Sequence, residues 1–257
     1  MAIQKIGFIG GGNMACALIT GIGKAMPDMS VAVSDPVGTK ADARLFDHNA
    51  ALVEWADLVF IAVKPHIVPI AMEQVRAVCA DKPFVSIAAG VTTETLVAGL
   101  PGARVCRTMP NTPAMMGEGM TALSLSHSLT AEEFAFVKKL LGCVGQTVEV
   151  EEDLFAAVTA MSGSGPAYYF ILIEAMADAA VLHGVPRALA YRLAAQTVVG
   201  AGVMARDSGL HPGALKDQVT SPHGTTIAAI DALEHANARS AMMDAVHAAY
   251  RRAREME

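Results

Sequence analysis

With 257 residues the chain is long enough for one or two domains. Hydrophobic residues make up 53% and charged residues 17%, so part of an unusually apolar surface is expected to lie between subunits. The net charge of -6, with Lys and Arg scattered, argues against a nucleic-acid or membrane partner and suits a small-molecule ligand. The four cysteines show no CxxC pair and no metal-ligand spacing, so we expect reduced thiols, a cytoplasmic protein and no metal.

The first element is an uncharged stretch, residues 6–23, that contains six glycines. A membrane-spanning helix or the apolar core of a signal peptide would not cluster glycines in this way. Residues 6–9 instead predict a strand, and the apolar positions from residue 15 to residue 22 recur at helical spacing. The stretch is therefore a strand, a glycine loop and a helix.

The glycine loop, Gly10-Gly11-Gly12-Asn13-Met14, matches the GxGxxA pattern together with the alanine that follows it. In this setting Gly10 permits a tight turn and Gly12 lets a diphosphate approach the backbone. The start of the helix offers unpaired N–H groups to phosphates. We predict dinucleotide binding by Gly10, Gly11, Gly12, Asn13 and Met14, with a flexible turn as the alternative.

Short apolar runs alternate with helical patterns through the first half of the chain, which predicts an α/β fold with a Rossmann-type, doubly wound parallel sheet. The expected strands are residues 6–9, 31–33, 58–63, 84–88, 105–106, 121–125 and 146–150. Thr130 and Glu133 have the spacing of a capping box that opens a helix to about Leu141.

The end of the second strand gives a mixed signal about the cofactor. Asp35 stands where an acidic residue binds the adenosine ribose of NAD, whereas Ser34, Thr39 and Lys40 could surround the 2′-phosphate of NADP. The alternative for Asp35 is a turn residue before a proline.

Three later strand ends should line the same crevice, because ligands of open α/β sheets bind outside the carboxyl ends of the strands. The candidate cofactor-binding residues there are Ala62, Val63, Lys64 and Pro65, then Ala88, Ala89 and Gly90, then Asn111. The alternatives are a solvated lysine for Lys64 and a plain turn for Asn111.

From residue 154 onward only helical spacing is found, so we predict a Rossmann domain over residues 1–153 and an all-α domain over residues 154–257. Residues 154–173 and 193–205 are uncharged and apolar nearly all round, and such helices must be buried. A second copy of the chain is the simplest cover, so we expect a homodimer through the C-terminal helices. Ser162 to Pro166 should interrupt the first of these helices.

Five motifs together resemble one family. They are Gly10-Gly11-Gly12-Asn13-Met14, Ala62-Val63-Lys64-Pro65, Met109-Pro110-Asn111-Thr112-Pro113, Ser162-Gly163-Ser164-Gly165-Pro166-Ala167-Tyr168 and Val219-Thr220-Ser221-Pro222-His223-Gly224-Thr225-Thr226. In this order they resemble the pyrroline-5-carboxylate reductases over nearly the whole chain. The resemblance implies reduction of Δ1-pyrroline-5-carboxylate to L-proline with NADPH or NADH, the final step of proline biosynthesis. It also implies helices that interlock two subunits and a larger ring such as a decamer.

The same resemblance implies roles for the last motif. Thr226 would hydrogen-bond the ring nitrogen, Ser221 and Thr225 would help to hold the carboxylate, and Gln218 would reach the nicotinamide. Backbone N–H groups of Gly224, Thr225 and Thr226, at the start of the next helix, would meet the carboxylate. No dedicated acid is visible. An ordinary turn and helix cap is the alternative reading of these residue types.

Two departures from the family pattern concern the ligands. His223 stands where the family has a small residue or asparagine, and the stretch from Asp35 to the next strand is shorter than is common, which weakens any prediction of cofactor preference. We expect His211 to have a structural role at a helix start, because a proline follows it.

Two competing functions stay open at this point. A β-hydroxyacid dehydrogenase relative would carry a lysine and an asparagine on the helix over residues 168–174, which has neither. A nucleotide-sensing regulator could keep the same fold without catalysis.

Overall fold

The computed structural model describes residues 3–257 and divides into two compact units. The first unit extends to Ser164 and also includes Ala249–Glu257, and the second is Gly165–Ala248. The chain therefore leaves the first unit once and returns to it at its last residues. The sequence-based boundary, between residues 153 and 154, lies before the short helices that lead to Ser164.

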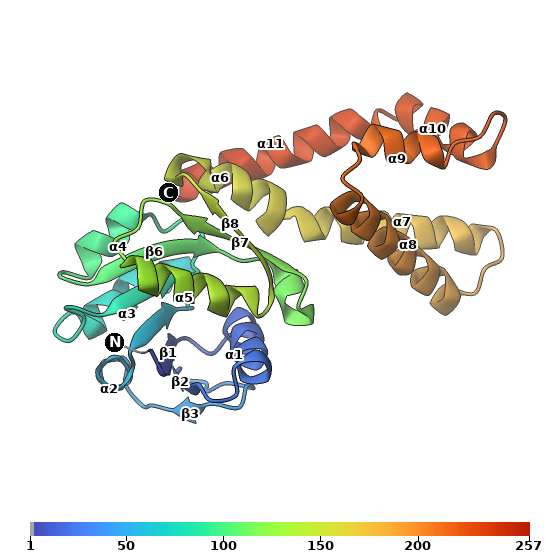
Figure 1. Ribbon diagram of the computed structural model, residues 1–257. Helices are drawn as coiled ribbons and strands as arrows, with labels where there is room; N and C mark the ends of the chain where they lie inside the picture. The colour runs from blue at the N-terminus through green and yellow to red at the C-terminus, as the bar shows by residue number, and fades with distance from the viewer. Residues whose placement is uncertain (1–2) are drawn as a thin grey trace. The chain divides into compact units, whose positions relative to one another are not determined.

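The first unit is built on one eight-stranded sheet of order β3-β2-β1-β4-β5-β6-β7-β8 (Figure 1). The strands are β1 (Lys5–Ile9), β2 (Ser30–Ser34), β3 (Arg44–Leu45), β4 (Leu58–Ile61), β5 (Pro83–Ser86), β6 (Arg104–Met109), β7 (Gly119–Ser124) and β8 (Gly145–Val150). All seven predicted strands are confirmed, and the Rossmann-type order of the first six is present.

Two features of the sheet differ from the prediction. β7 runs antiparallel to β6, and β8 then pairs parallel with β7, so the sheet is predominantly rather than wholly parallel. β3 is an additional edge strand of two exposed residues, too short to leave an apolar pattern in the sequence. Throughout the described chain no helix separates β2 from β3.

Helices cover both faces of the sheet, which explains why its central strands are apolar throughout. On one face α1 (Asn13–Ala25) and α5 (Ala131–Gly142) pack on a core around the stacked rings of Phe8 and Phe60. On the other face lie α2 (Asn49–Trp55), α3 (Val68–Val75) and α4 (Thr93–Gly99). The predicted capping box is confirmed, because Thr130 and Glu133 exchange both hydrogen bonds at the start of α5.

The chain leaves the first unit through α6 (Phe155–Val158) and a π-helical turn, η4 (Thr159–Gly163). The predicted interruption is confirmed as this turn and a bend at Ser164, after which α7 (Gly165–Leu182) begins. Pro166 stands in the first turn of α7, where its missing N–H has no intrahelical partner to lose.

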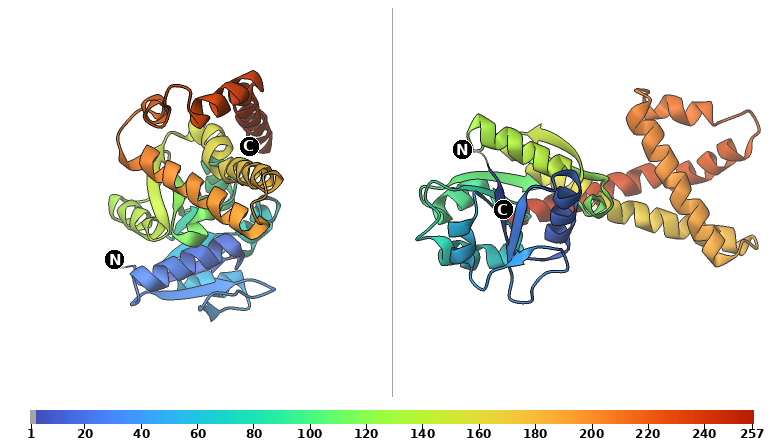
Figure 2. Two further views of the ribbon diagram at one scale, coloured as in Figure 1. Left: turned by 90° about the vertical axis from the view of Figure 1, so that its right-hand side faces the viewer. Right: turned by 60° about the horizontal axis from the view of Figure 1, so that its bottom comes forward.

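The second unit contains α7, α8 (Arg187–Asp207), α9 (Pro212–Gln218), α10 (Thr225–His235) and most of α11 (Ala238–Met256) (Figure 2). Its buried core is small: Ala177, Ala190 and Ala194 meet where α7 packs on α8. The predicted role of His211 is confirmed, because its Nδ1 accepts the N–H of Gly213 at the start of α9.

Large apolar side chains on α7 and α8 are exposed in the single chain, among them Phe170, Ile171, Leu193 and Val199. Two helical stretches, Glu152–Leu182 and Arg187–Asp207, are long and apolar enough to cross a membrane by length and composition alone. The same exposed faces have the character of a subunit interface, which would bury them equally well.

Candidate active site

The glycine loop after β1 is held by backbone contacts that only glycine permits. Gly10 has φ +103°, and its N–H donates to the carbonyl of Ser34 at 2.9 Å. A Cβ at Gly10 would lie 2.6 Å from the carbonyl oxygen of Ala62. The ends of β1, β2 and β4 therefore meet at this residue.

Gly11 is enclosed, whereas Gly12 is open. The N–H of Gly11 donates to Asp35 Oδ2 at 2.8 Å, and a Cβ there would lie 2.6 Å from the carbonyl of Gly38. A Cβ at Gly12 would meet no atom within 4 Å in the described chain. Gly12 is the N-cap of α1, and over residues 3–257 no side chain caps that helix and no acidic residue stands in its first turn. The first N–H groups of α1 are thus available to an anion.

Both carboxylate oxygens of Asp35 accept backbone N–H groups. Oδ2 binds Gly11, and Oδ1 accepts from Val37 at 2.8 Å in a side-chain turn. The structure thus gives Asp35 the turn role that the sequence left open, and adds a role in closing the glycine loop. Thr39 packs close by, with its Oγ1 3.2 Å from Cys16 Sγ, and Lys40 is exposed.

A cavity of about 330 Å³ lies at the carboxyl end of β2, where a dinucleotide places its adenosine ribose. Ser34 and Pro36 line it together with His48, Asn49 and Gln74, and Asn49 Nδ2 donates to Gln74 Oε1 at 2.6 Å. The last three residues have no signature in the sequence, because only the packing of α2 and α3 brings them to the end of β2.

The other predicted strand-end residues follow β4, β5 and β6, which are neighbours in the sheet. Ala62 donates its N–H to Ile9 at 2.8 Å, Val63 contacts the glycine loop, and Lys64 is exposed at the N-cap of the 3-10 turn η1 (Pro65–Ile67). Ala88 and Ala89 lead to Gly90, which has φ +73° and packs against Met256. These loops follow the carboxyl ends of their strands, the same end of the sheet at which α1 begins after β1.

Asn111 has two structural partners. Its Nδ2 donates to the carbonyl of Ser162 at 3.0 Å, and its Oδ1 accepts the N–H of Met120 at 2.9 Å. The side chain thus ties the loop after β6 to β7 and to the π-helical turn, which favours the structural alternative for this residue.

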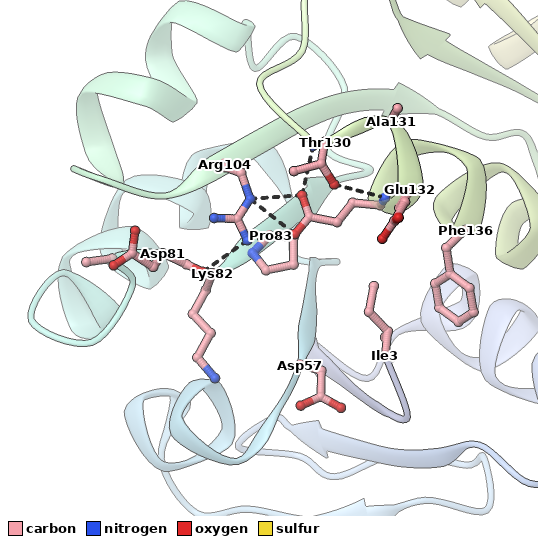
Figure 3. Close-up of a pocket in the computed structure, with 12 residues that line it drawn as sticks. Ile3, Asp57, Asp81, Lys82, Pro83, Arg104, Thr130, Ala131, Glu132 and Phe136 are labelled. Carbon is pink, nitrogen blue, oxygen red and sulfur yellow. Dashed lines mark hydrogen bonds and ion pairs between the residues drawn. The ribbon is translucent and has the colours of Figure 1, made fainter. Parts of the chain in front are cut away.

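A second cavity, of about 1060 Å³, lies at the amino ends of the central strands, opposite the end at which the glycine loop begins (Figure 3). Four of its charged residues have partners. Asp57 accepts the N–H groups of Gln4 and Lys5, and Lys82 Nζ donates to the carbonyl of Ala56. Arg104 holds Glu133 through two nitrogens, at 2.8 and 2.6 Å. Burial by itself would raise the pKa of Glu133, but the hydrogen bonds from Arg104 and Thr130 keep that pKa below its usual value. This cavity lies at the amino ends of the strands, so it is separate from the glycine loop, which follows the carboxyl end of β1.

In the second unit the predicted substrate motif forms a tight turn between α9 and α10. Gly224 donates its N–H to the carbonyl of Ser221 at 3.0 Å, so this N–H closes the turn in the structure, and the role of Gly224 in binding a carboxylate stays a prediction. Gly224 is the N-cap of α10, and among the described residues no side chain caps that helix and no acid stands in its first turn. The N–H groups of Thr225 and Thr226 are the ones that open toward an anion. Gln218 is the exposed last residue of α9.

His223 occupies the left-handed region, with φ +56°, at the third position of this turn. Glycine or asparagine adopts this conformation more readily than histidine. We expect His223→Asn to raise the free energy of unfolding by about 0.5 kcal/mol through relief of backbone strain. Urea denaturation would measure the change in the free energy of unfolding. His247→Asn in α11 is the control and should have about zero effect, since histidine and asparagine have similar helix propensities. A destabilised His223→Asn protein would contradict the explanation.

The remaining candidate chemistry is limited. All four cysteines are free thiols, and burial raises the pKa of the Cys106 thiol to about 12, so it is not a thiolate nucleophile. Within residues 3–257 no group of three His, Cys, Asp or Glu side chains is placed to hold a metal ion.

Comparison with known proteins identifies the chain. It is 41% identical to the pyrroline-5-carboxylate reductase of Synechocystis over 100% of this chain and 99% of that protein. The chain belongs to the pyrroline-5-carboxylate reductase family. It is also 43% identical to the pyrroline-5-carboxylate reductase of Escherichia coli, with 95% of this chain and 94% of that protein aligned.

The family assignment extends over both units of this reductase. A sequence profile described as pyrroline-5-carboxylate reductase dimerisation matches residues 152–256, and one described as NADP oxidoreductase, coenzyme F420-dependent, matches residues 5–90. A solved pyrroline carboxylate reductase from Plasmodium falciparum, with NADP bound, superimposes with a TM-score of 0.91 at 28% identity over 99% of both chains. A pyrroline-5-carboxylate reductase from Coxiella burnetii gives 0.91 at 33% identity, over 100% of this chain and 99% of that one.

Proposed function

We propose that the chain reduces the C=N bond of Δ1-pyrroline-5-carboxylate to give L-proline, with NADPH as hydride donor, in proline biosynthesis. The observation that carries the proposal is a pair of uncapped helix starts. Both α1 and α10 begin after a glycine, and within the described residues neither has a side-chain cap or an acid in its first turn. The reaction requires two anion sites, one for the diphosphate of the cofactor and one for the carboxylate of the substrate.

The glycine loop fits a dinucleotide. The open space at Gly12 admits a diphosphate to the N–H groups of Asn13 and Met14, and the helix dipole favours the negative charge. The ribose cavity would engage Ser34 and Asn49. When bound, NADPH supplies the hydride, and the loops at Ala62–Pro65 and Ala88–Gly90 would orient its rings. Asn111, at the end of β6, stays a proposed cofactor-binding residue, and Gln218 keeps the role at the nicotinamide that the family resemblance implies.

The substrate turn supplies orientation and charge. The N–H groups of Thr225 and Thr226, with the Ser221 hydroxyl, would hold the carboxylate of the cyclic imine. The hydroxyl of Thr226 would hydrogen-bond the ring nitrogen and hold it in line for reduction. An imine protonated by solvent already accepts hydride, so these residues act by binding and alignment and need no side-chain acid.

We expect Thr226→Val to lower kcat/KM about fivefold, because one hydrogen bond to the reacting nitrogen is worth about 1 kcal/mol. Valine keeps the shape of threonine without its hydroxyl. Steady-state kinetics at saturating NADPH would measure the loss, and Thr226→Ser, which keeps the hydroxyl, should retain most of the activity. Equal kinetics for the valine and wild-type proteins would remove Thr226 from the mechanism.

The test of the proposed function is the loss of NADPH absorbance on addition of pyrroline-5-carboxylate, with a 3-hydroxyacid and NADP⁺ as the control for a dehydrogenase. Turnover of the hydroxyacid alone, or binding of the dinucleotide without turnover, would favour the competing functions. The ratio of kcat/KM for NADPH and NADH would settle the preference, which we expect to favour NADPH. Both Asp35 oxygens are engaged by backbone, and Lys40 is the basic residue of the loop after β2.

The remaining proposals concern assembly and location. We propose that residues 1–153 bind the cofactor and that residues 154–257 bind substrate and form a homodimer, further assembled into a ring such as a decamer. The exposed apolar faces of α7 and α8 and the dimerisation profile over residues 152–256 support the dimer. We place the enzyme in the cytoplasm. Light scattering of the purified protein would measure the assembly.

A further inference from the structure

Arg107, on β6, is a buried cation that the proposed reaction does not use. Its side chain is 3% exposed and its guanidinium lies 4.4 Å from the centre of the Phe155 ring. It makes two ion pairs, Nη1 to Glu152 Oε1 and Nη2 to Glu257 Oε1, each at 2.8 Å. The two acids are far apart in the sequence and meet on one guanidinium.

Glu152 is held from several directions. Its oxygens accept the N–H and the hydroxyl of Thr93, at 3.0 and 2.8 Å, and the hydroxyl of Ser124. Burial by itself would raise the pKa of the Glu152 carboxyl, but the hydrogen bonds from Ser124, Arg107 and Thr93 lower it. Glu152 is therefore an anion at neutral pH. It is therefore a fixed point between the start of α4, the end of β7 and Arg107.

Glu257 marks a second attachment, at the end of α11. Its side chain is 14% exposed and also accepts from Arg254 Nη1 at 3.1 Å. One residue earlier, Met256 lies so close to Gly90 that a Cβ on the glycine would come within 2.8 Å of the Met256 Cβ. The last turn of α11 is thus packed on the loop after β5 and pinned by Arg107.

These attachments bracket the excursion of the chain into the second unit. Glu152 precedes the exit after Ser164, and Glu257 follows the return at Ala249. Everything between those crossings, including the Ser221 to Thr226 turn, belongs to the second unit. One guanidinium therefore anchors both segments through which that unit is joined to the sheet.

Stability alone is a poor explanation for this cluster. Arg107 and Arg254 together balance the charges of Glu152 and Glu257, yet apolar replacements of buried ion-pair triads are often neutral or stabilising. The geometry suits a positioning role instead. A planar guanidinium can hold two carboxylates in set directions, so Arg107 fixes the positions of the segments that carry Glu152 and Glu257.

We propose that Arg107 is a positioning residue for the reaction, acting through Glu152 and Glu257 to hold both connections of the substrate-binding unit. The inference rests on the proposed function, because its readout is the reductase reaction. Weakening one attachment should impair the use of the imine substrate while leaving the binding of NADPH to the glycine loop intact.

The test uses Glu257→Gln in the full-length enzyme, which removes the ion pairs of Glu257 with Arg107 and Arg254 and leaves the Arg107–Glu152 pair in place. We expect KM for pyrroline-5-carboxylate to rise about tenfold, while the Kd of NADPH stays within twofold. Glu257→Asp should recover part of the loss, because it restores the charge. The matched control is Glu255→Gln, which breaks an exposed pair with Arg252 in the same helical turn and should leave KM unchanged.

Three outcomes would overturn the inference. They are an unchanged KM in Glu257→Gln, an equal rise in Glu255→Gln, and a rise that only follows dissociation of the assembly in light scattering. Arg107→Lys, which keeps the charge but cannot pair both acids equally, provides a second variant and should raise KM in the same direction. A wild-type protein without reductase activity would instead overturn the proposed function.

Discussion

Replacing Gly12 with aspartate should stabilise the first unit and remove most of its affinity for NADPH. The space at Gly12 accommodates a side chain, and aspartate at an N-cap stabilises a helix by a few tenths of a kcal/mol more than glycine. The same carboxylate would stand where we propose that the diphosphate binds. Mutual repulsion and the loss of the open space should weaken NADPH binding about 100-fold. Fluorescence titration of NADPH and the denaturant midpoint would measure the two effects.

The prediction is specific because stability should rise while NADPH affinity falls. A variant that bound NADPH poorly because it was partly unfolded would lose stability as well. Gly23→Ala is the matched control in the same helix. A Cβ there also meets no atom within 4 Å in the described chain, and alanine in a helix interior should add about 1 kcal/mol. Its NADPH affinity should equal that of the wild type. A Gly12→Asp protein with wild-type NADPH affinity would mean that the diphosphate binds elsewhere.

The fold was predictable from sequence to the extent that burial leaves a pattern. The central strands are covered on both faces, so their apolar runs are visible, and the capping box at Thr130 uses residues only three positions apart. The direction of β7 was not predictable, because an apolar run is the same read in either direction. The edge strand β3 was missed because neither Arg44 nor Leu45 is buried.

Some parts of the candidate site could likewise be predicted from the sequence, and others could not. The glycine loop is local, so its conformation follows from Gly10 to Gly12 directly. Asn49 and the true partners of Asp35 depend on neighbours brought together by the sheet, and neither has a sequence signature. Arg107 was overlooked for a related reason: it lies in a strand whose pattern indicates only burial, and its partners are known once Glu152 and Glu257 meet in the fold.

Replacing Gly224 with alanine should raise KM for pyrroline-5-carboxylate strongly and leave NADPH binding unchanged, the reverse of the Gly12 variant. A Cβ at Gly224 would lie 2.4 Å from Ser221 Oγ and 3.1 Å from its carbonyl oxygen. The Ser221 hydroxyl must therefore rotate away, which removes one proposed ligand of the substrate carboxylate and loosens the turn. We expect KM to rise about tenfold or more, since a hydrogen bond to a charged group is worth about 1.5–3 kcal/mol.

A double-mutant cycle separates the hydroxyl from the backbone. Ser221→Ala alone should raise KM by a similar factor, because it removes the same ligand. Adding Gly224→Ala to Ser221→Ala should then cost much less than in the wild type, because the hydroxyl that the new Cβ displaces is already gone. Fully additive effects would show that Ser221 and Gly224 act separately. The carboxylate would then be held by the N–H groups of Thr225 and Thr226 without the serine, which would narrow the substrate site to the first turn of α10.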